Sequence, residues 1–342
     1  MNKFQKDNLF KKNIWSHTRD SYTDWFAESK LKSFFSKQLS YMNLSLWWIT
    51  KNADKDNTVE NNWYHNLKIL LNKEKKIIYD RKLFFLIFTG KLFKNFLRDI
   101  IFCLMIKLFF FTRFAKIKKK NCFYSIEIDL VQNGKLSYDR MYSHTPLKSK
   151  KNDNFYLVNV VNHFNFFKSI FYYKRLFSKL EIPYVISNEF ITINQILKIH
   201  FFTLLCFFRL LLYLKKNKNL FIINKIDCSS VLKPLLLSSF SGSIQKSLIE
   251  GVSIKNYAKK NKFNFFINYI EFNPRSRSVY HFIKESKKNI KTISYQGSLC
   301  NENVLPYLHR SKEFTHKRGK EGGIYSPSPD FYFVQGKQFK KL

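Results

Sequence analysis

Two short apolar runs separated by a capped helical stretch constrain the fold of this chain more than any other feature. Residues 263–271 (FNFFINYIE) have the pattern of a buried strand, and residues 290–295 (IKTISY) have that of a second one. Between them, Asn273 followed by Pro274 is typical of a helix N-cap with proline at the first helical position. Because strand–helix–strand connections are right-handed crossovers, the two strands are predicted to be parallel and adjacent.

The same alternation extends over residues 121–330, where runs rich in Val, Ile, Phe and Tyr are separated by helical patterns. The predicted elements are strands at 155–161, 184–187 and 220–223, a helix at 166–180, and a helix to about Lys260 that the Ser-Gly-Ser segment at 241–243 would cap. This order is the signature of βαβ units. The predicted fold class is therefore α/β, a Rossmann-like parallel sheet with helices on both faces.

Residues 1–120 are predicted to be mostly helical and rich in basic residues and Phe. Apolar residues recur at helical spacing in residues 29–46 and 63–71. Two further apolar segments, 100–111 and 201–214, are each shorter than the roughly 20 residues that cross a bilayer. Neither segment is therefore predicted to span a membrane.

The first of these segments has features of a membrane-surface helix. Lys91, Lys94 and Arg98 share one helical face, an apolar face lies opposite, and a basic run follows at 113–120. This pattern favours a helix that lies on an anionic membrane surface. Helices buried in a globular core are the alternative for both segments.

Composition limits the classes of function. The chain has 342 residues with a formal net charge of +36, and it is long enough for one large domain or two ordinary ones. Such a charge ordinarily indicates nucleic acid or an anionic membrane. However, the abundance of Lys, Asn, Phe and Ile beside only 9 Gly and 7 Pro is typical of an AT-rich genome, which adds lysines without creating a binding face. The charge by itself therefore does not predict a nucleic-acid partner.

The cysteines and the N-terminus indicate the compartment. The five Cys show no CxxC spacing, which favours a reducing environment. The same spacing argues against a metal site and against a disulfide framework. Residues 1–13 are charged and no apolar stretch follows them, so they do not form a secretory signal. We expect a cytoplasmic protein, peripheral at the inner face of the cytoplasmic membrane.

Candidate site residues follow from the rule that open α/β sheets bind ligands at the carboxyl ends of their strands. The rule selects two candidate catalytic residues, Glu271 and His163, with Asn162 beside the histidine, and six candidate substrate-binding residues: Asn273, Arg275, Arg277, Gln296, Gly297 and Ser298. An acidic residue, two arginines and a small Gly-Ser turn would suit sugar hydroxyls or a phosphate.

Each candidate also has a structural interpretation. Asn273 suits a helix cap, Arg275 and Arg277 suit solvated positions, Glu271 suits a structural ion pair and His163 suits a loop histidine. The chain contains no GxGxxG, Walker or GxSxG motif. Dinucleotide dehydrogenases, P-loop enzymes and serine hydrolases are therefore disfavoured.

Residues 268–298 and 326–342 resemble the bacterial surface-carbohydrate biosynthesis proteins, which are glycosyltransferase-like and have the two-Rossmann GT-B architecture. In that family an acidic strand end precedes a helix, a second strand ends near Tyr-Gln-His, and Pro-Asp opens the first strand of a second domain. The corresponding residues here are Tyr269 to Asn273, Tyr295-Gln296, and Pro329-Asp330 with Gly336. Gly297 stands where the family commonly has His.

The resemblance implies transfer of a sugar or sugar-phosphate unit from an activated donor to a glycan or lipid-linked acceptor. It implies that residues 121–330 form the acceptor domain. Residues 331–342 would then begin a second domain, absent here, that holds the nucleotide-activated sugar donor. No cofactor is expected in this chain, and the fragment alone is expected to be inactive.

Two other functions stay open. A nucleic-acid-binding protein of an AT-rich genome would need its basic residues on one face. A non-catalytic scaffold of polysaccharide assembly would be consistent with Gly297.

Overall fold

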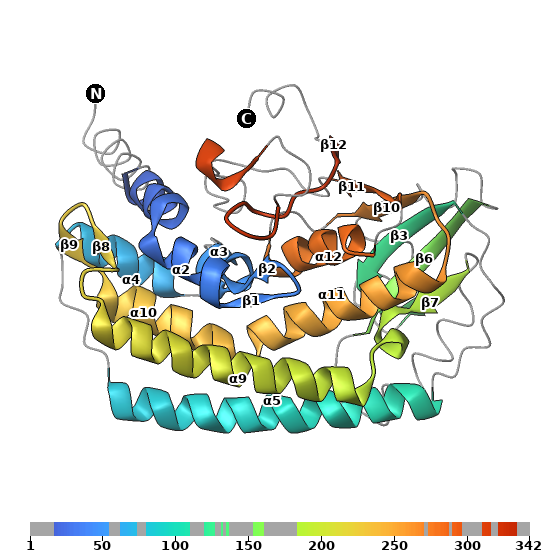
Figure 1. The fold of residues 1–342 in the computed structure, drawn as a ribbon, viewed down its shortest axis with the longest axis horizontal. Helices are drawn as coiled ribbons and strands as arrows, with labels where there is room; N and C mark the ends of the chain where they lie inside the picture. Colours follow the sequence, from blue (N-terminus) through green and yellow to red (C-terminus); the bar gives the residue numbers. More distant parts are fainter. Residues whose placement is uncertain are drawn as a thin grey trace. The chain divides into compact units, whose positions relative to one another are not determined.

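The computed structural model describes residues 17–54, 62–73, 80–109, 120–126, 131–132, 135–136, 153–160, 183–269, 273–286, 289–295, 310–315 and 321–333. The chain forms two compact units, and Figure 1 traces both. The first unit comprises Met1–Lys94, Phe201–Gln245 and Cys300–Pro327, and the second comprises Asn95–His200, Lys246–Leu299 and Ser328–Leu342. These units do not coincide with the predicted division at residue 120, because the chain passes between them several times.

The second unit contains a six-stranded sheet with the strand order β12-β11-β10-β3-β6-β7. Its strands are β3 (Asn121–Ile126), β6 (Asn154–Asn159), β7 (Tyr184–Ile186), β10 (Phe265–Asn268), β11 (Lys291–Tyr295) and β12 (Phe331–Phe333). Every neighbouring pair is parallel. The α/β, Rossmann-like fold class is thus confirmed.

The strand pair predicted from residues 263–271 and 290–295 is present. β10 and β11 are parallel neighbours, with Phe266 opposite Thr292. The predicted helix between them is α12 (Pro274–Lys284), and Asn273 caps it by accepting a hydrogen bond from the backbone N–H of Ser276 at 2.8 Å. The local cap signal therefore predicts the start of this helix correctly.

In the central strands β3 and β6, side chains of both sheet faces are buried, which explains the nearly continuous apolar run of β6. One face packs against α12 and α11 (Ser243–Lys260), and the shared core includes Tyr124, Leu157 and Phe266 from the strands. Phe123 and Tyr156 lie on the opposite face and are also buried. α11 ends at Lys260, as predicted, and begins at Ser243, within the Ser-Gly-Ser segment predicted to cap it.

The first unit is built around aromatic residues. It contains a helix over residues 17–28, α2 (Lys30–Gln38), the hairpin β1 (Ser40–Tyr41) and β2 (Leu44–Ser45), η1 (Leu46–Ile49), α3 (Lys51–Asp54), α4 (Asn62–Leu71), α10 (Ser229–Ser238), η4 (Ser239–Ser241) and η6 (Ser311–Glu313). Trp47 stacks on Phe26 with ring centroids 4.7 Å apart. The helix predicted at 29–46 ends at Gln38, because Met42 and Asn43 adopt positive φ in the hairpin turn.

The predicted strand at 220–223 is wrong as a member of the parallel sheet. It contributes to a separate antiparallel hairpin, β8 (Ile222–Ile223) with β9 (Ile226–Asp227), in the first unit. Asn224 and Lys225 both have positive φ, as a two-residue hairpin turn of this type requires. A four-residue apolar run alone does not distinguish a hairpin from a βαβ strand.

Residues 331–333, which the resemblance assigns to the start of a second domain, form a strand of this sheet. β12 pairs in parallel with β11, and Phe331 lies opposite Ile293. Asp330 fixes this edge, because its carboxylate accepts hydrogen bonds from the backbone N–H and hydroxyl of Thr292 at 2.9 and 3.0 Å. β12 is therefore the edge strand of the sheet already described.

Two long helices include the apolar segments. α5 (Arg81–Phe109) has 29 residues and α9 (Ile193–Lys216) has 24, so the segment at 201–214 belongs to a longer helix than predicted. Within the described residues, α9 is the one helix with the length and composition to cross a membrane. Core helices of soluble proteins meet the same criterion, so this finding alone assigns no membrane span.

The remaining elements are short. β4 (Val131–Gln132) pairs with β5 (Lys135–Leu136) as an antiparallel hairpin, and η3 (Ser187–Phe190) follows β7. The helix predicted at 166–180 lies outside the described residues.

Candidate functional site

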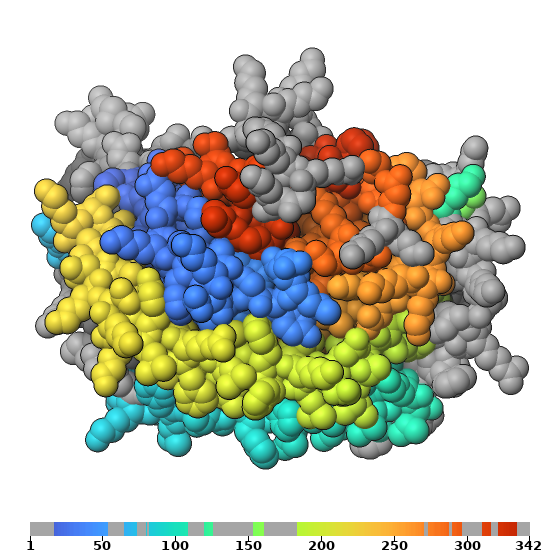
Figure 2. Space-filling model, in the orientation of Figure 1, coloured from blue at the N-terminus to red at the C-terminus, as the bar shows by residue number. Residues whose placement is uncertain are grey.

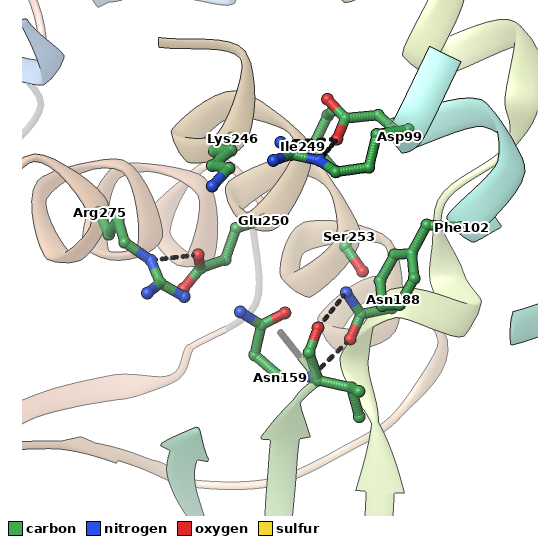
Figure 3. A pocket seen from close by; sticks show the side chains of 11 residues that line it. Asp99, Phe102, Asn159, Asn188, Lys246, Ile249, Glu250, Ser253 and Arg275 are labelled. Carbon is green, nitrogen blue, oxygen red and sulfur yellow. Dashed lines mark hydrogen bonds and ion pairs between the residues drawn. The ribbon is translucent and has the colours of Figure 1, made fainter. Parts of the chain in front are cut away.

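A cavity of about 240 Å³ lies at the carboxyl edge of the parallel sheet, within the second unit (Figure 3). Asn159 and Val160 come from the end of β6, and Asn188 follows β7 directly. The helices contribute Arg98, Asp99 and Phe102 (α5), Lys246, Ile249, Glu250 and Ser253 (α11) and Arg275 (α12). This is the edge at which open α/β sheets bind ligands.

Glu250 is the buried carboxylate of the cavity, and both its oxygens have partners. Oε2 accepts a hydrogen bond from Nε of Arg275 at 2.7 Å, and Oε1 accepts one from the hydroxyl of Tyr124. Burial raises the pKa of Tyr124, and the charge of Glu250 raises it further, so the phenol stays protonated. Glu250 is therefore suited to holding Arg275 in place.

The pair is electrostatically asymmetric. The side chain of Glu250 is 5% exposed, whereas that of Arg275 is 32% exposed. Burial, the largest single effect, disfavours the charged form of Arg275, but the attractions of Glu250, Tyr124 and Tyr269 together outweigh it, and the pKa of Arg275 is raised. The guanidinium remains charged and reaches the cavity.

A second carboxylate, that of Asp99, also has partners for both of its oxygens. Its Oδ1 accepts hydrogen bonds from Nε and Nη2 of Arg98 at 3.3 and 3.2 Å, and its Oδ2 lies 3.1 Å from Nε2 of His200. His200 is buried, and Phe96 packs edge-on against its ring. The charges of Asp99 and Arg98 thus largely compensate each other.

Lys246 differs from the two arginines because it forms no hydrogen bond or ion pair with any of the residues that the structure describes. Much of its side chain is exposed. Its pKa is nevertheless lowered, chiefly by loss of hydration and next by the positive charge of Arg98. The negative charges of Asp99 and Glu250 act in the opposite direction without outweighing these effects. The ammonium group therefore lacks full hydration and has no direct ion pair with a described carboxylate.

Neutral polar groups line the sheet side of the cavity. The backbone of Val160 fixes the side chain of Asn188. Oδ1 of Asn188 accepts a hydrogen bond from the backbone N–H of Val160 at 2.9 Å, and Nδ2 of Asn188 donates one to the carbonyl of Val160 at 3.4 Å. Ser253 donates to the carbonyl of Ser187, and Asn159 Oδ1 accepts from the Ser187 hydroxyl at 3.5 Å. The Nδ2 of Asn159 makes no hydrogen bond with a described residue, and Figure 3 shows this amide between Glu250 and Asn188.

The predicted site residues that the structure describes have different roles. Arg275 lines the cavity, whereas Asn273 uses its side-chain oxygen as the cap of α12. Arg277 is fully buried rather than solvated, and it does not line this cavity. The other predicted site residues, Asn162, His163, Glu271, Gln296, Gly297 and Ser298, lie outside the described residues, and their roles stay predictions.

Sequence reasoning missed Lys246, Glu250, Asn159 and Asn188. Asn188 directly follows the strand predicted at 184–187, so the strand-end rule would have selected it, whereas Asn159 lies within the strand predicted at 155–161. Lys246 and Glu250 are four residues apart in a predicted helix, a spacing that places them on one face. Nothing in the sequence indicates that this face is the one turned toward the strand ends.

A second cavity, of about 620 Å³, lies in the first unit. Its wall includes Phe85, Leu214, Lys218, Lys233 and Asp227. The carboxylate of Asp227 accepts a hydrogen bond from the backbone N–H of Ser229 at 2.9 Å, at the start of α10. This cavity lacks the buried charged residues of the first one.

No group of three or more His, Cys, Asp or Glu residues with metal-binding geometry occurs among the described residues. Their four cysteines, Cys103, Cys122, Cys206 and Cys228, are buried free thiols.

No protein-family model matches the chain, and searches of the curated proteins and of the solved structures found no significant match. The resemblance to surface-carbohydrate biosynthesis proteins therefore rests on its motif residues alone.

Proposed function

We propose that the cavity at the carboxyl edge of the sheet binds the phosphate of a sugar phosphate, and that the protein acts in surface polysaccharide biosynthesis by glycosyltransferase-like transfer of a sugar or sugar-phosphate unit. The observation that carries this proposal is the ammonium group of Lys246, which lies in the cavity without a described ion-pair partner. A bound anion would supply the missing negative charge.

The charge balance of the cavity supports an anionic ligand. Arg98 is paired with Asp99 and Arg275 with Glu250, so the positive charge of Lys246 remains uncompensated among the described lining residues. Arginine forms directed hydrogen bonds to phosphate, and lysine attracts it as a point charge. A phosphate beside Lys246 would raise the lowered pKa of this lysine and stabilise its charged form.

The neutral polar groups of the cavity support binding of a sugar. The Nδ2 of Asn159 can donate to a hydroxyl oxygen, and this amide lies in the space between the strand ends and α11. A polar ligand needs such placed donors because hydroxyls that lose water without a partner weaken binding.

The size of the cavity favours a small head group. Pockets that enclose drug-sized ligands measure about 300 to 1,000 Å³, and this cavity measures about 240 Å³. A phosphorylated monosaccharide suits this volume better than an entire nucleotide sugar does. The proposal therefore assigns the acceptor side of the reaction to this cavity.

A transfer assay tests the proposed function. The protein would be incubated with radiolabelled nucleotide sugars and bacterial membrane extract as acceptor, and label in the polymer and lipid fractions would be counted. The proposal departs here from the expectation that residues 1–342 alone are inactive, because the cavity and the six-stranded sheet both lie within these residues. We expect transfer by the wild type and a loss of about tenfold or more in Lys246→Met, because a charged partner of the substrate is removed. Lys259→Met, on the exposed surface of the same helix, is the matched control and should retain transfer. Equal transfer by all three proteins, or no transfer from any donor, would contradict the proposal.

A further inference from the structure

The exposed side of α9 is apolar. Leu197, Phe201, Leu205, Phe208 and Leu212 recur every three or four residues, and each is more than 40% exposed. Phe201 is 65% exposed and Leu212 is 61% exposed. This spacing places all five on one face of the helix. We call them the α9 stripe.

The opposite side of α9 is packed against protein. In the first unit, Phe207 stacks on Phe88 of α5 with ring centroids 4.5 Å apart, and Tyr213 stacks on Phe34 at 3.8 Å. Thr203 accepts a buried hydrogen bond from Nε2 of Gln245 at 3.0 Å. A helix held in this way cannot be surrounded by lipid, so its length does not make it a membrane span.

α5, which packs on α9, is also exposed and apolar. Its exposed apolar residues are Leu83, Phe85, Leu86, Ile87, Phe93, Leu97, Ile101, Leu104 and Leu108. Figure 2 shows α9 in yellow-green and α5 in cyan as part of the visible surface. Two adjacent helices thus present large apolar side chains to solvent, which marks an interaction surface.

The charges on these helices indicate what covers that surface. Eight basic residues are exposed on them: Lys82, Lys91, Lys94 and Lys107 on α5, and Lys198, Arg209, Lys215 and Lys216 on α9. Asp99 is the only acidic residue in the two helical sequences, and it is paired with Arg98. A second copy of this chain would bring like charges together, whereas an anionic bilayer has both the apolar interior and the opposite charge.

We infer that α5 and α9 attach the protein to an anionic membrane surface, with the α9 stripe and the exposed apolar residues of α5 entering the boundary between headgroups and acyl chains. The two helices lie in the plane of the interface and do not cross the bilayer. This inference is independent of what the cavity binds. It adds α9, which the sequence did not predict to contact a membrane, to the basic helix that the sequence singled out.

Vesicle flotation tests the inference. The full chain would be floated with vesicles of phosphatidylcholine alone or with about one third phosphatidylglycerol, at about 50 mM and about 500 mM salt. We expect flotation with the anionic vesicles at low salt, a several-fold decrease at high salt, and release by alkaline carbonate. Failure to float at low salt, or carbonate-resistant flotation, would overturn the inference.

Matched variants distinguish membrane binding by the α9 stripe from nonspecific adsorption by other exposed apolar residues. Phe201→Gln with Phe208→Gln should reduce flotation about tenfold while leaving the thermal unfolding temperature near that of the wild type, because both side chains are exposed. Ile324→Gln with Phe331→Gln, which alters exposed apolar residues outside α5 and α9, should float like the wild type. Equal flotation of both double variants would overturn the inference. So would a wild-type dimer in light scattering that the α9 variant converts to a monomer.

Discussion

Arg275 donates a hydrogen bond from Nε to Oε2 of Glu250 over 2.7 Å, and this ion pair joins α12 to α11 at the cavity. Tyr124 of β3 donates to the other carboxylate oxygen, so the same carboxylate also joins the helices to the sheet. The position of Arg275 in the cavity therefore depends on a residue 25 positions away in the sequence.

Glu250→Gln should lower the free energy of unfolding by about 2 kcal/mol. The amide would leave Arg275 without its counter-charge, and truncating a fully buried pair costs about 3 to 5 kcal/mol, which the partial exposure of Arg275 reduces. Urea denaturation followed by circular dichroism measures this change. Glu285→Gln is the control, because Glu285 and Lys255 are 4.0 Å apart and Glu285 is more exposed, so its loss should be below about 1 kcal/mol. Equal losses in the two variants would contradict this account of Glu250.

Lys246→Met should make the protein more stable than the wild type at neutral pH, and this advantage should shrink at alkaline pH. The pKa of Lys246 is lowered in the folded protein, so the unfolded chain binds its proton more tightly. Keeping the ammonium charged in the fold therefore costs stability below the folded pKa, and the cost disappears as the pH rises through that pKa toward 10.5. Thermal unfolding across neutral to alkaline pH, compared with Lys259→Met, measures the trend. A constant difference at every pH would show that Lys246 is fully solvated.

Gly251→Ala should destabilise the second unit by about 1 to 3 kcal/mol. A Cβ atom there would lie 2.6 Å from Oγ of Ser278 and would overlap the ring of Phe282, so α11 and α12 would have to separate. Gly90→Ala in α5 is the matched control, because a Cβ meets nothing within 4 Å there and alanine favours the helix by about 0.5 to 1 kcal/mol. Opposite shifts in unfolding temperature are expected, and a stabilised Gly251→Ala would refute the close packing.

Asn273→Ala should cost about 1 kcal/mol, whereas Asn273→Ser should remain close to the wild type. The side-chain oxygen of Asn273 accepts from the N–H of Ser276, and a serine hydroxyl can replace it. Chemical denaturation of both variants provides the measurement. If Asn273→Ser lowered the free energy of unfolding as much as Asn273→Ala, Asn273 would not stabilise the protein by capping α12.

The elements that the sequence predicted well are those whose signal is local. Asn273 and Pro274 define the start of α12 within two residues, and the strand–helix–strand order then places β10 beside β11. The partner of β12 could not be predicted in this way, because pairing with β11 depends on residues about 40 positions away. The hairpin of β8 and β9 was missed because its two strands have only two residues each.

The edge of the sheet that holds the site was predictable, but the composition of the site was not. The strand-end rule predicted the correct edge of the sheet, but it pointed to the ends of the strands at 263–271 and 290–295, whereas the cavity lies at the ends of β6 and β7. Of the predicted residues that the structure describes, Arg275 lines this cavity. Lys246 and Arg98 come from helices, and only the tertiary packing of α11 and α5 brings them to the strand ends. The long apolar helices were underestimated because Lys107 and Arg209 interrupt their pattern, although exposed basic residues are compatible with a helix.

The most direct test of the proposed site is the binding of glucose 1-phosphate, followed by isothermal titration and by the ³¹P resonance of the ligand. The wild type should bind glucose 1-phosphate saturably and more tightly than glucose. Lys246→Met should bind it about tenfold or more weakly, which corresponds to about 1.4 kcal/mol or more, and Lys259→Met should bind like the wild type. Identical affinities of the wild type and Lys246→Met, or no saturable binding of glucose 1-phosphate to the wild type, would contradict a phosphate site at Lys246.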